Sequence, residues 1–265
     1  MDFQTHYLSP DIKRSLFNGG IFKTEVVFET HILVWLISGE TKIVLADAHC
    51  IFSAGDTFLI PRNQLAAIIN YPKDGLPHKA VAMHLSAKRL KAFYAKNEIN
   101  SNALPSMKIR KFNEHPLLSS CLASLIHYFD LEESLPENLA SLKIEEAITI
   151  LRSIDPETDG MLGSFESPAK VSLTEFMEKN YMFNMTMDKF SYLTGRSLTS
   201  FKRDFRQAYN SSPQRWLTKK RLELAHYQIR EQRRKPSEVY AEVGFENLSH
   251  FTYAFRKQFG YAPTE

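Results

Sequence analysis

Two groups of polar side chains near the end of this sequence have the types and spacing that contacts with nucleic acid require. The first group is Thr199, Lys202, Arg203 and Arg206. The second group begins fifty positions later and consists of Ser249, His250, Tyr253 and Arg256, with Lys257 beside them. Hydroxyl, imidazole, ammonium and guanidinium groups hydrogen-bond to base edges and to phosphates. Their arrangement predicts a DNA-binding surface.

An apolar repeat predicts the helices that position these groups. Its first copy is Leu198, Phe201, Phe205 and Tyr209, and its second copy is Leu248, Phe251, Phe255 and Phe259. Spacings of three, four and four place each set on one face of a helix. A short helical segment and a glycine precede each helix, at 187–194 with Gly195 and at 237–243 with Gly244. Helix, glycine turn and second helix are typical of a helix-turn-helix unit.

Stacked helical repeats, with periods of about 34 or 40 residues, also repeat apolar faces. Here the sequence has only two copies, and their outward faces are basic or hydrogen-bonding rather than apolar, which favours DNA binding. Between the copies, Pro213 is expected to open a helix that runs to about Gln232. Its roughly eighteen residues span roughly 27 Å, enough to hold two recognition helices near the ~34 Å repeat of B-DNA.

Charge divides the chain into two parts. The 265 residues carry a net charge of +3. From Val171 onward there are 16 Lys and Arg against 10 Asp and Glu, a net +6, whereas the preceding part carries −3. A basic module joined to a slightly acidic one fits a nucleic-acid-binding domain with a separate regulatory domain. We predict a regulatory and dimerisation domain at 1–154, a linker at 155–170 and a DNA-binding domain at 171–265.

The first part predicts an α+β fold class, with a small antiparallel β-barrel or sandwich followed by helices. Short runs rich in β-branched and aromatic residues, separated by turns, lie at 20–28, 32–37, 42–46, 57–60, 66–71 and 79–85. A helical period then follows Ser86 and continues over 117–129 and 139–154. The last two helices have two open roles: they cover the sheet, or they offer a seam to a second copy of the chain. An all-α domain with the two helix-turn-helix units completes the architecture.

The carboxy-terminal motifs resemble those of the AraC family of bacterial transcription regulators. The matching segments are Gly195-Arg196-Ser197, Phe201-Lys202-Arg203, Ser212-Pro213-Gln214, Arg221-Leu222-Glu223, Val243-Gly244-Phe245, Ser249-His250-Phe251 and Phe259-Gly260-Tyr261-Ala262-Pro263. The resemblance covers about the last ninety-five residues. It implies a monomeric seven-helix domain with two recognition helices in adjacent major grooves, and activation of transcription near RNA polymerase. Family members usually continue into a further short helix, whereas this sequence ends at Glu265.

The resemblance also implies a role for each polar position. The family's base-reading positions are matched by Thr199, Lys202, Arg203, Ser249, His250 and Tyr253. Phosphate contacts are expected from Ser197, Arg206, Asn247, Arg256 and Lys257. An arginine that spans guanine O6 and N7 contributes about 1–3 kcal/mol of discrimination. Because the family often has a basic residue where Tyr253 stands, weaker readout is expected from the second unit. Solvated surface charge is an equally good interpretation of Arg206 and Lys257.

The first ninety residues resemble the cupin-like barrel that many of these regulators carry. The resemblance rests on Gly55-Asp56-Thr57-Phe58-Leu59-Ile60-Pro61. Where metal-binding cupins have a histidine after this motif, Asn63 and Gln64 stand, and His31 has no His-x-His partner. A catalytic metal needs about three protein ligands. We therefore predict no metal, no cofactor and a strand-edge role for His31.

The leading interpretation is a sequence-specific transcription regulator, an activator controlled through its first domain. Its expected partners are double-stranded DNA, RNA polymerase, a second copy of the chain, and a small-molecule or protein effector. Two alternatives are a cupin-type metalloenzyme and an alkyl-accepting repair regulator, each fused to the DNA-binding domain. The missing histidines argue against the first, and the lack of basic and histidine neighbours at Cys50 and Cys121 argues against the second. No signal peptide or membrane-spanning run is present in the sequence, which predicts a cytoplasmic protein that acts on the bacterial nucleoid.

Overall fold

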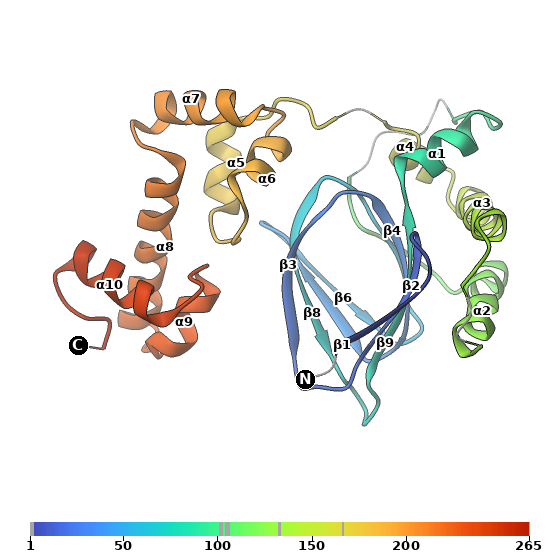
Figure 1. The fold of residues 1–265 in the computed structure, drawn as a ribbon, viewed down its shortest axis with the longest axis horizontal. Helices are drawn as coiled ribbons and strands as arrows, with labels where there is room; N and C mark the ends of the chain where they lie inside the picture. Colours follow the sequence, from blue (N-terminus) through green and yellow to red (C-terminus); the bar gives the residue numbers. More distant parts are fainter. Residues whose placement is uncertain (1–2, 101–102, 104–106, 132–133, 166, 265) are drawn as a thin grey trace. The chain divides into compact units, whose positions relative to one another are not determined.

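The chain forms two compact units, Met1–Glu166 and Ser167–Glu265. Its computed structural model describes residues 3–100, 103, 107–131, 134–165 and 167–264. Figure 1 colours the first unit from blue through green and the second from yellow to red. Glu265, with which the predicted DNA-binding domain ends, lies outside the described residues.

Two antiparallel sheets make up most of the first unit. The larger sheet has the order β1 (Phe3–Ser9), β2 (Ile12–Phe17), β9 (His78–Leu85), β4 (His31–Ser38), β7 (Thr57–Ile60) and β10 (Arg110–Phe112). The smaller sheet has the order β3 (Phe22–Phe28), β8 (Gln64–Tyr71), β5 (Glu40–Val44) and β6 (His49–Ser53). Because alternate side chains of a strand point to opposite faces, each central strand contributes to two layers.

Apolar side chains line the space between the two sheets. Phe28 and Ile43 come from the smaller sheet, and Leu36 and Phe58 from the larger one. The rings of Phe52 and Phe58 stack with their centroids 3.7 Å apart. Closure into a barrel requires strand pairing at both edges, and no pairing in the described residues joins the sheets. The expected closed barrel is therefore a pair of facing antiparallel sheets.

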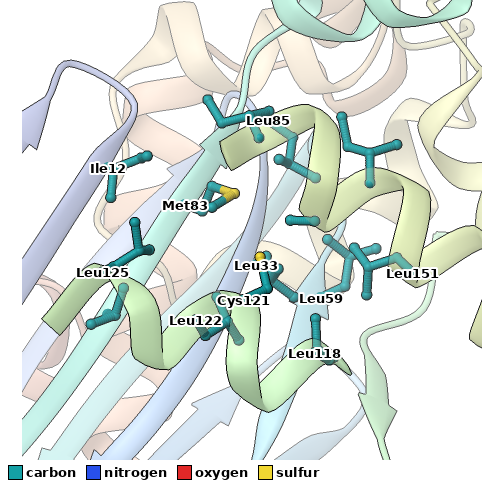
Figure 2. Packing of buried hydrophobic residues seen from close by; sticks show 14 of the residues in the cluster. Ile12, Leu33, Leu59, Met83, Leu85, Leu118, Cys121, Leu122, Leu125 and Leu151 are labelled. Carbon is teal, nitrogen blue, oxygen red and sulfur yellow. The ribbon is translucent and has the colours of Figure 1, made fainter. Parts of the chain in front are cut away.

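Helices cover the other face of the larger sheet. They are α1 (Ala87–Tyr94), α2 (Pro116–Asp130), α3 (Glu137–Ile154) and α4 (Thr158–Leu162). Figure 2 shows Leu122 and Leu125 of α2 and Leu151 of α3 in one apolar cluster with the strand residues Leu33 and Met83. The apolar stripes predicted at 117–129 and 139–154 thus cover the sheet.

The segment predicted as a linker, 155–170, begins with a packed helix. Met161 and Leu162 of α4 are fully buried in the core that α1, α2 and α3 share. The Asp159 carboxylate, only 2% exposed, accepts a hydrogen bond from the Tyr94 hydroxyl at 2.7 Å. The first half of this segment therefore belongs to the first unit.

Six helices are present in residues 167–264. They are α5 (Leu173–Asn180), α6 (Met187–Leu193), α7 (Leu198–Tyr209), α8 (Pro213–Arg230), α9 (Pro236–Glu242) and α10 (Leu248–Phe259). The pairs α6–α7 and α9–α10 are the two predicted helix-turn-helix units, and α8 joins them. Ser212 caps α8, and Pro213 occupies its first turn, where the missing N–H removes no helical hydrogen bond. The helix ends at Arg230, two residues before the predicted end.

Helix α8 contributes to the apolar cores of both helix-turn-helix units. Near its start, the Trp216 ring packs against Phe205 of α7, with centroids 5.5 Å apart. Further along, Leu222 and Ala225 join the cluster that contains Phe255 of α10. One continuous helix is therefore built into both units.

Candidate nucleic-acid interface

The two recognition helices, α7 and α10, begin and end in the same way. The Ser197 hydroxyl accepts a hydrogen bond from the Ser200 amide at 3.2 Å, and the Asn247 side-chain oxygen accepts one from the His250 amide at 2.7 Å. Such caps satisfy amide groups that a helix start leaves without partners. After twelve residues each helix ends at a left-handed residue, Asn210 or Gly260.

Aromatic side chains fix the rotation of both helices about their axes. Phe201 and Phe205 of α7 are fully buried, as are Phe251 and Phe255 of α10. The apolar repeat in the sequence thus becomes one buried face on each helix. Since that face is occupied, the opposite side of each helix points to solvent.

All eleven predicted DNA-contacting residues lie exposed on these two helices or at their caps. In the first unit they are Ser197, Thr199, Lys202, Arg203 and Arg206. In the second unit they are Asn247, Ser249, His250, Tyr253, Arg256 and Lys257. On α7 the structure brings four of them together around one shallow surface hollow, which Gln207 also lines. Gln207 was not among the predicted contacts, although its position on the exposed face follows from the same helical period.

Arg203 is already engaged within the unit. Its Nε and Nη2 donate hydrogen bonds to Asp204 Oδ1 at 3.2 and 3.0 Å. Arg196 Nε donates to the other carboxylate oxygen at 3.2 Å. Hydrogen bonds from Arg203 and Arg196 lower the pKa of the Asp204 carboxyl below its ordinary value. Asp204 is therefore a charged neighbour of the predicted base reader, and it was not among the residues predicted from the sequence.

The glycine of the first turn allows a close backbone approach. Gly195 has a φ of +66°, a left-handed conformation that side chains rarely adopt. A Cβ atom at this position would lie 2.6 Å from the Ala169 carbonyl oxygen. The segment around Ala169, which precedes α5, therefore lies directly against the turn between α6 and α7.

Arg221 of α8 connects the loop between α5 and α6 to the turn of the second helix-turn-helix unit. Its Nε donates to the Tyr181 carbonyl at 3.0 Å, and its Nη2 donates to the Phe183 carbonyl at 2.7 Å. Its Nη1 reaches the second unit, where it donates to the Gly244 carbonyl at 3.1 Å. Gly244 has a φ of +87°, and a Cβ there would meet the Arg221 guanidinium at 2.9 Å. One side chain thus joins the α5–α6 loop to the turn between α9 and α10.

The basic segment from Arg230 to Lys235 is only partly available to DNA. Arg234 donates two hydrogen bonds to the Glu242 carboxylate, at 2.6 and 2.8 Å. The Arg230 guanidinium lies over the Tyr261 ring, 4.4 Å from its centroid. These two arginines thus support the second unit.

The described residues contain no group of three His, Cys, Asp or Glu side chains able to hold a metal ion. His31 is the first residue of β4 and is 1% exposed. Its Nδ1 accepts a hydrogen bond from the Arg62 amide at 3.2 Å. Burial, together with the charge of Arg62, lowers the pKa of His31 to about 3. The imidazole is therefore neutral and takes part in packing.

Cys121 lacks the setting of an alkyl acceptor. Burial raises the pKa of the Cys121 thiol to about 12, whereas reactive thiols have a lowered pKa. Cys50 is half-buried in β6.

Within the part of the chain that the structure describes, no helix is long and apolar enough to cross a membrane.

Family models match both units of the chain. Residues 192–265 match the model described as a helix-turn-helix domain. Residues 31–159 match the model described as the ExsA N-terminal regulatory domain.

Curated relatives and a solved structure extend this comparison. The HTH-type transcriptional regulator ExsA of Pseudomonas aeruginosa is 27% identical over 237 residues, which are 86% of this chain and 83% of ExsA. The thermoregulatory protein LcrF of Yersinia pestis is 30% identical over 156 residues, which are 58% of this chain and 57% of LcrF. A fatty-acid-bound structure of ToxT from Vibrio cholerae aligns with 96% of this chain and 94% of its own, at 10% identity and a TM-score of 0.46.

These relatives are transcription regulators and not enzymes, in agreement with a DNA-binding surface and against the metalloenzyme alternative. Both helix-turn-helix units have the buried aromatic faces, glycine turns and exposed polar faces that the sequence motifs predicted. The chain belongs to the AraC family of DNA-binding transcription regulators.

Proposed function

We propose that this regulator activates transcription by placing α7 and α10 in successive major grooves of one DNA duplex. The observation that supports this most strongly is the repeated geometry of the two helices. Each presents an exposed polar face, and α8 is built into the cores behind both. An α-helix fits the major groove, where each base pair presents a distinct pattern of donors and acceptors.

The exposed residues divide between two kinds of contact. Base edges would be read by Thr199, Lys202, Arg203, Ser249, His250 and Tyr253. Phosphates would be bound by Ser197, Arg206, Asn247, Arg256 and Lys257. Hydroxyl and amide groups at the two helix starts suit phosphate contacts, because helix amino-termini favour anions. Residues 171–265 are the DNA-binding domain of this proposal, with the amino-terminal part as its regulatory domain.

The space between the two sheets is the proposed effector site. A cavity of about 560 Å³ lies there, lined by residues of both sheets. At its polar side, Thr41 Oγ1 lies 2.7 Å from His78 Nε2 and donates to Asn70 Oδ1 at 3.1 Å. His78 is 2% exposed, and its Nδ1 has no hydrogen-bond partner. A small molecule with apolar surface and one hydrogen-bonding group suits this lining, although a protein effector on the outside of the unit is the alternative.

A second copy of the chain is the proposed partner of the outer face of α2 and α3. Leu117 and Leu142 are large apolar residues on these helices that remain 58% and 60% exposed. Light scattering should give twice 30.6 kDa for the full chain, and Leu142→Glu should return it to one copy. A full-length monomer at micromolar concentration contradicts the dimer and leaves the DNA-binding proposal intact. RNA polymerase is the further partner expected of an activator, on the nucleoid of the bacterial cytoplasm.

Selection of sequences from genomic and random DNA by the full chain tests the proposed function. We expect enrichment of one sequence class upstream of promoters, with an affinity that falls steeply as salt rises, because several phosphates release counterions. Binding without sequence preference, or with a nearly flat salt dependence, contradicts the proposal. The selected sequence also supplies the operator for the experiments below.

A further inference from the structure

Asp204 links an exposed arginine of α7 to the interior of the unit. The Arg203 side chain is 74% exposed, whereas that of Asp204 is 19% exposed. Oδ1 of the carboxylate accepts two hydrogen bonds from Arg203, through Nε and Nη2. Oδ2 accepts the bond from Arg196. The carboxylate therefore lies between a solvent-facing guanidinium and an internal one.

Arg196 fixes the position of that carboxylate. Its side chain is only 8% exposed. Its Nη1 donates to the Thr194 carbonyl at 2.7 Å and to the Val171 carbonyl at 2.9 Å. Charge-assisted bonds around a buried anchor hold geometry better than an isolated surface ion pair does. Asp204 is therefore anchored before Arg203 meets DNA.

This arrangement leaves one edge of Arg203 for a ligand. A guanidinium has five N–H groups in a planar fork. Two of them, on Nε and Nη2, bond to Asp204. The two outer N–H groups, one on Nη1 and one on Nη2, are parallel and match the O6 and N7 acceptors of guanine. Fixing the first edge thus orients the second.

We propose that Asp204 is a positioning residue for base recognition, which holds Arg203 by its Nε–Nη2 edge so that the outer edge meets a guanine. The inference rests on the proposed contact of Arg203 with a base. A side chain that is already ordered loses less freedom on binding, which favours the operator by about threefold to tenfold. The carboxylate also repels the phosphates of any duplex, which weakens binding to operator and random DNA alike. The ordering of Arg203 is therefore the effect that raises the ratio of operator affinity to random-DNA affinity.

The second helix-turn-helix unit provides an internal comparison. Fifty positions after Arg203 and Asp204 stand Tyr253 and Ala254, and fifty after Arg196 stands Glu246. Tyr253 is 66% exposed, and alanine has no group that could fix it. The first unit is therefore expected to impose the stricter base preference.

The test compares Asp204→Asn with wild type in the full chain, by fluorescence anisotropy on the selected operator and on a random duplex. We expect the ratio of the two affinities to fall by about threefold to tenfold, through weaker operator binding and stronger random binding. Glu246→Gln is the matched control, because it removes an exposed carboxylate from the second turn without touching Arg203. It should change the ratio by less than about twofold.

A second pair of variants separates positioning from a structural role. A lysine ammonium has no planar fork, so it cannot bond to Asp204 through one edge and to a base through another. The double variant Arg203→Lys with Asp204→Asn should therefore have the same ratio of operator to random-DNA affinity as Arg203→Lys alone. An equal fall of the ratio in that background means that Asp204 acts through Arg196 on the turn, and the proposal is then wrong. Equal tightening on both DNAs means that Asp204 only repels phosphates, which also overturns it.

Thermal unfolding checks that each variant folds. Where Asp204→Asn does not, Asp204→Glu serves instead, because it keeps the charge and displaces the carboxylate by one methylene. The ratio should fall for this variant too, and an unchanged ratio refutes the proposal. A wild-type protein without sequence preference counts against the proposed function. A wild-type sequence preference that Asp204→Asn leaves unchanged counts against this inference alone.

Discussion

Replacing Arg221 by methionine should destabilise the compact unit Ser167–Glu265 by about 3 kcal/mol. The change removes hydrogen bonds to the carbonyls of Tyr181, Phe183 and Gly244. A hydrogen bond from a charged donor contributes about 1.5–3 kcal/mol, but Arg221 is half-buried and water can replace part of each bond, so we count about 1 kcal/mol for each. Methionine keeps most of the apolar stem, which isolates the loss of the guanidinium.

Urea unfolding followed by tryptophan fluorescence measures this effect. The sequence has two tryptophans, so Trp35→Phe leaves Trp216, 8% exposed beside α7, as the reporter of the second unit. The control is Arg215→Met, an exposed position on the same helix, which should shift stability by less than about 0.5 kcal/mol. Equal urea midpoints for the two variants would refute the role assigned to Arg221.

Three further predictions follow from the geometry. Arg203→Ala should lower operator affinity by about 1–3 kcal/mol and random-DNA affinity much less, whereas Arg206→Ala should weaken both and reduce the salt slope by about one; anisotropy titrations at several salt concentrations decide, and equal losses for Arg203→Ala contradict base readout. Gly195→Ala should cost about 1–3 kcal/mol in the same urea assay, because the left-handed backbone and the nearby Ala169 carbonyl leave no unstrained place for a Cβ; an unchanged midpoint contradicts the close approach. Burial lowers the pKa of His31 to about 3, so the unfolded chain takes up a proton first, and the stability that this residue contributes above about pH 6.5 should fall by about 2 kcal/mol at pH 5. Burial also lowers the pKa values of His78 and His84, each to about 4, so His31→Gln should reduce the fall measured through Trp35 by about 2 kcal/mol and leave the part due to those two residues; an identical profile in that variant speaks against a buried neutral imidazole.

The helices of residues 167–264 could be predicted because several local signals agree there. The apolar period of Phe201 and Phe205, the cap at Ser197 and the glycine at Gly195 all place α7 within the same few residues. Its repetition fifty positions later gave the same boundaries for α10. The exposed face followed directly from the buried one, so the candidate DNA-contacting residues needed no tertiary information.

Strands β1, β2, β6 and β10 were not predicted, and for β2 and β10 the reason is that their pairing depends on distant segments. β2 contains Lys13, Arg14 and Ser15 in succession, which hides the alternation of a half-buried strand, and it pairs with β9 more than sixty residues away. β10 has three residues and exists by pairing with β7. Long-range partners of this kind leave little trace in a local pattern.

The network around Asp204 was also beyond a local pattern. Arg196 lies in the turn before α7 and Asp204 on that helix, and the Arg196 Nε donates to Asp204 Oδ2. The period places Asp204 beside Phe205 but does not show which cations face it. Tertiary contacts decide the partners of charged side chains, so the sequence alone predicted the exposed arginine and not its carboxylate.

The single helix α8, shared by both cores, fixes the spacing and orientation of the two recognition helices. One base pair inserted between their sites moves the second site by about 3.4 Å and rotates it by about 35° around the duplex. Trp216 and Leu222 pack into different cores from one continuous helix. The distance between the two recognition helices therefore cannot change to match a longer or shorter site. Operators of this regulator should therefore tolerate a changed base far better than a changed length, so that a single-nucleotide deletion in a promoter is the more damaging mutation.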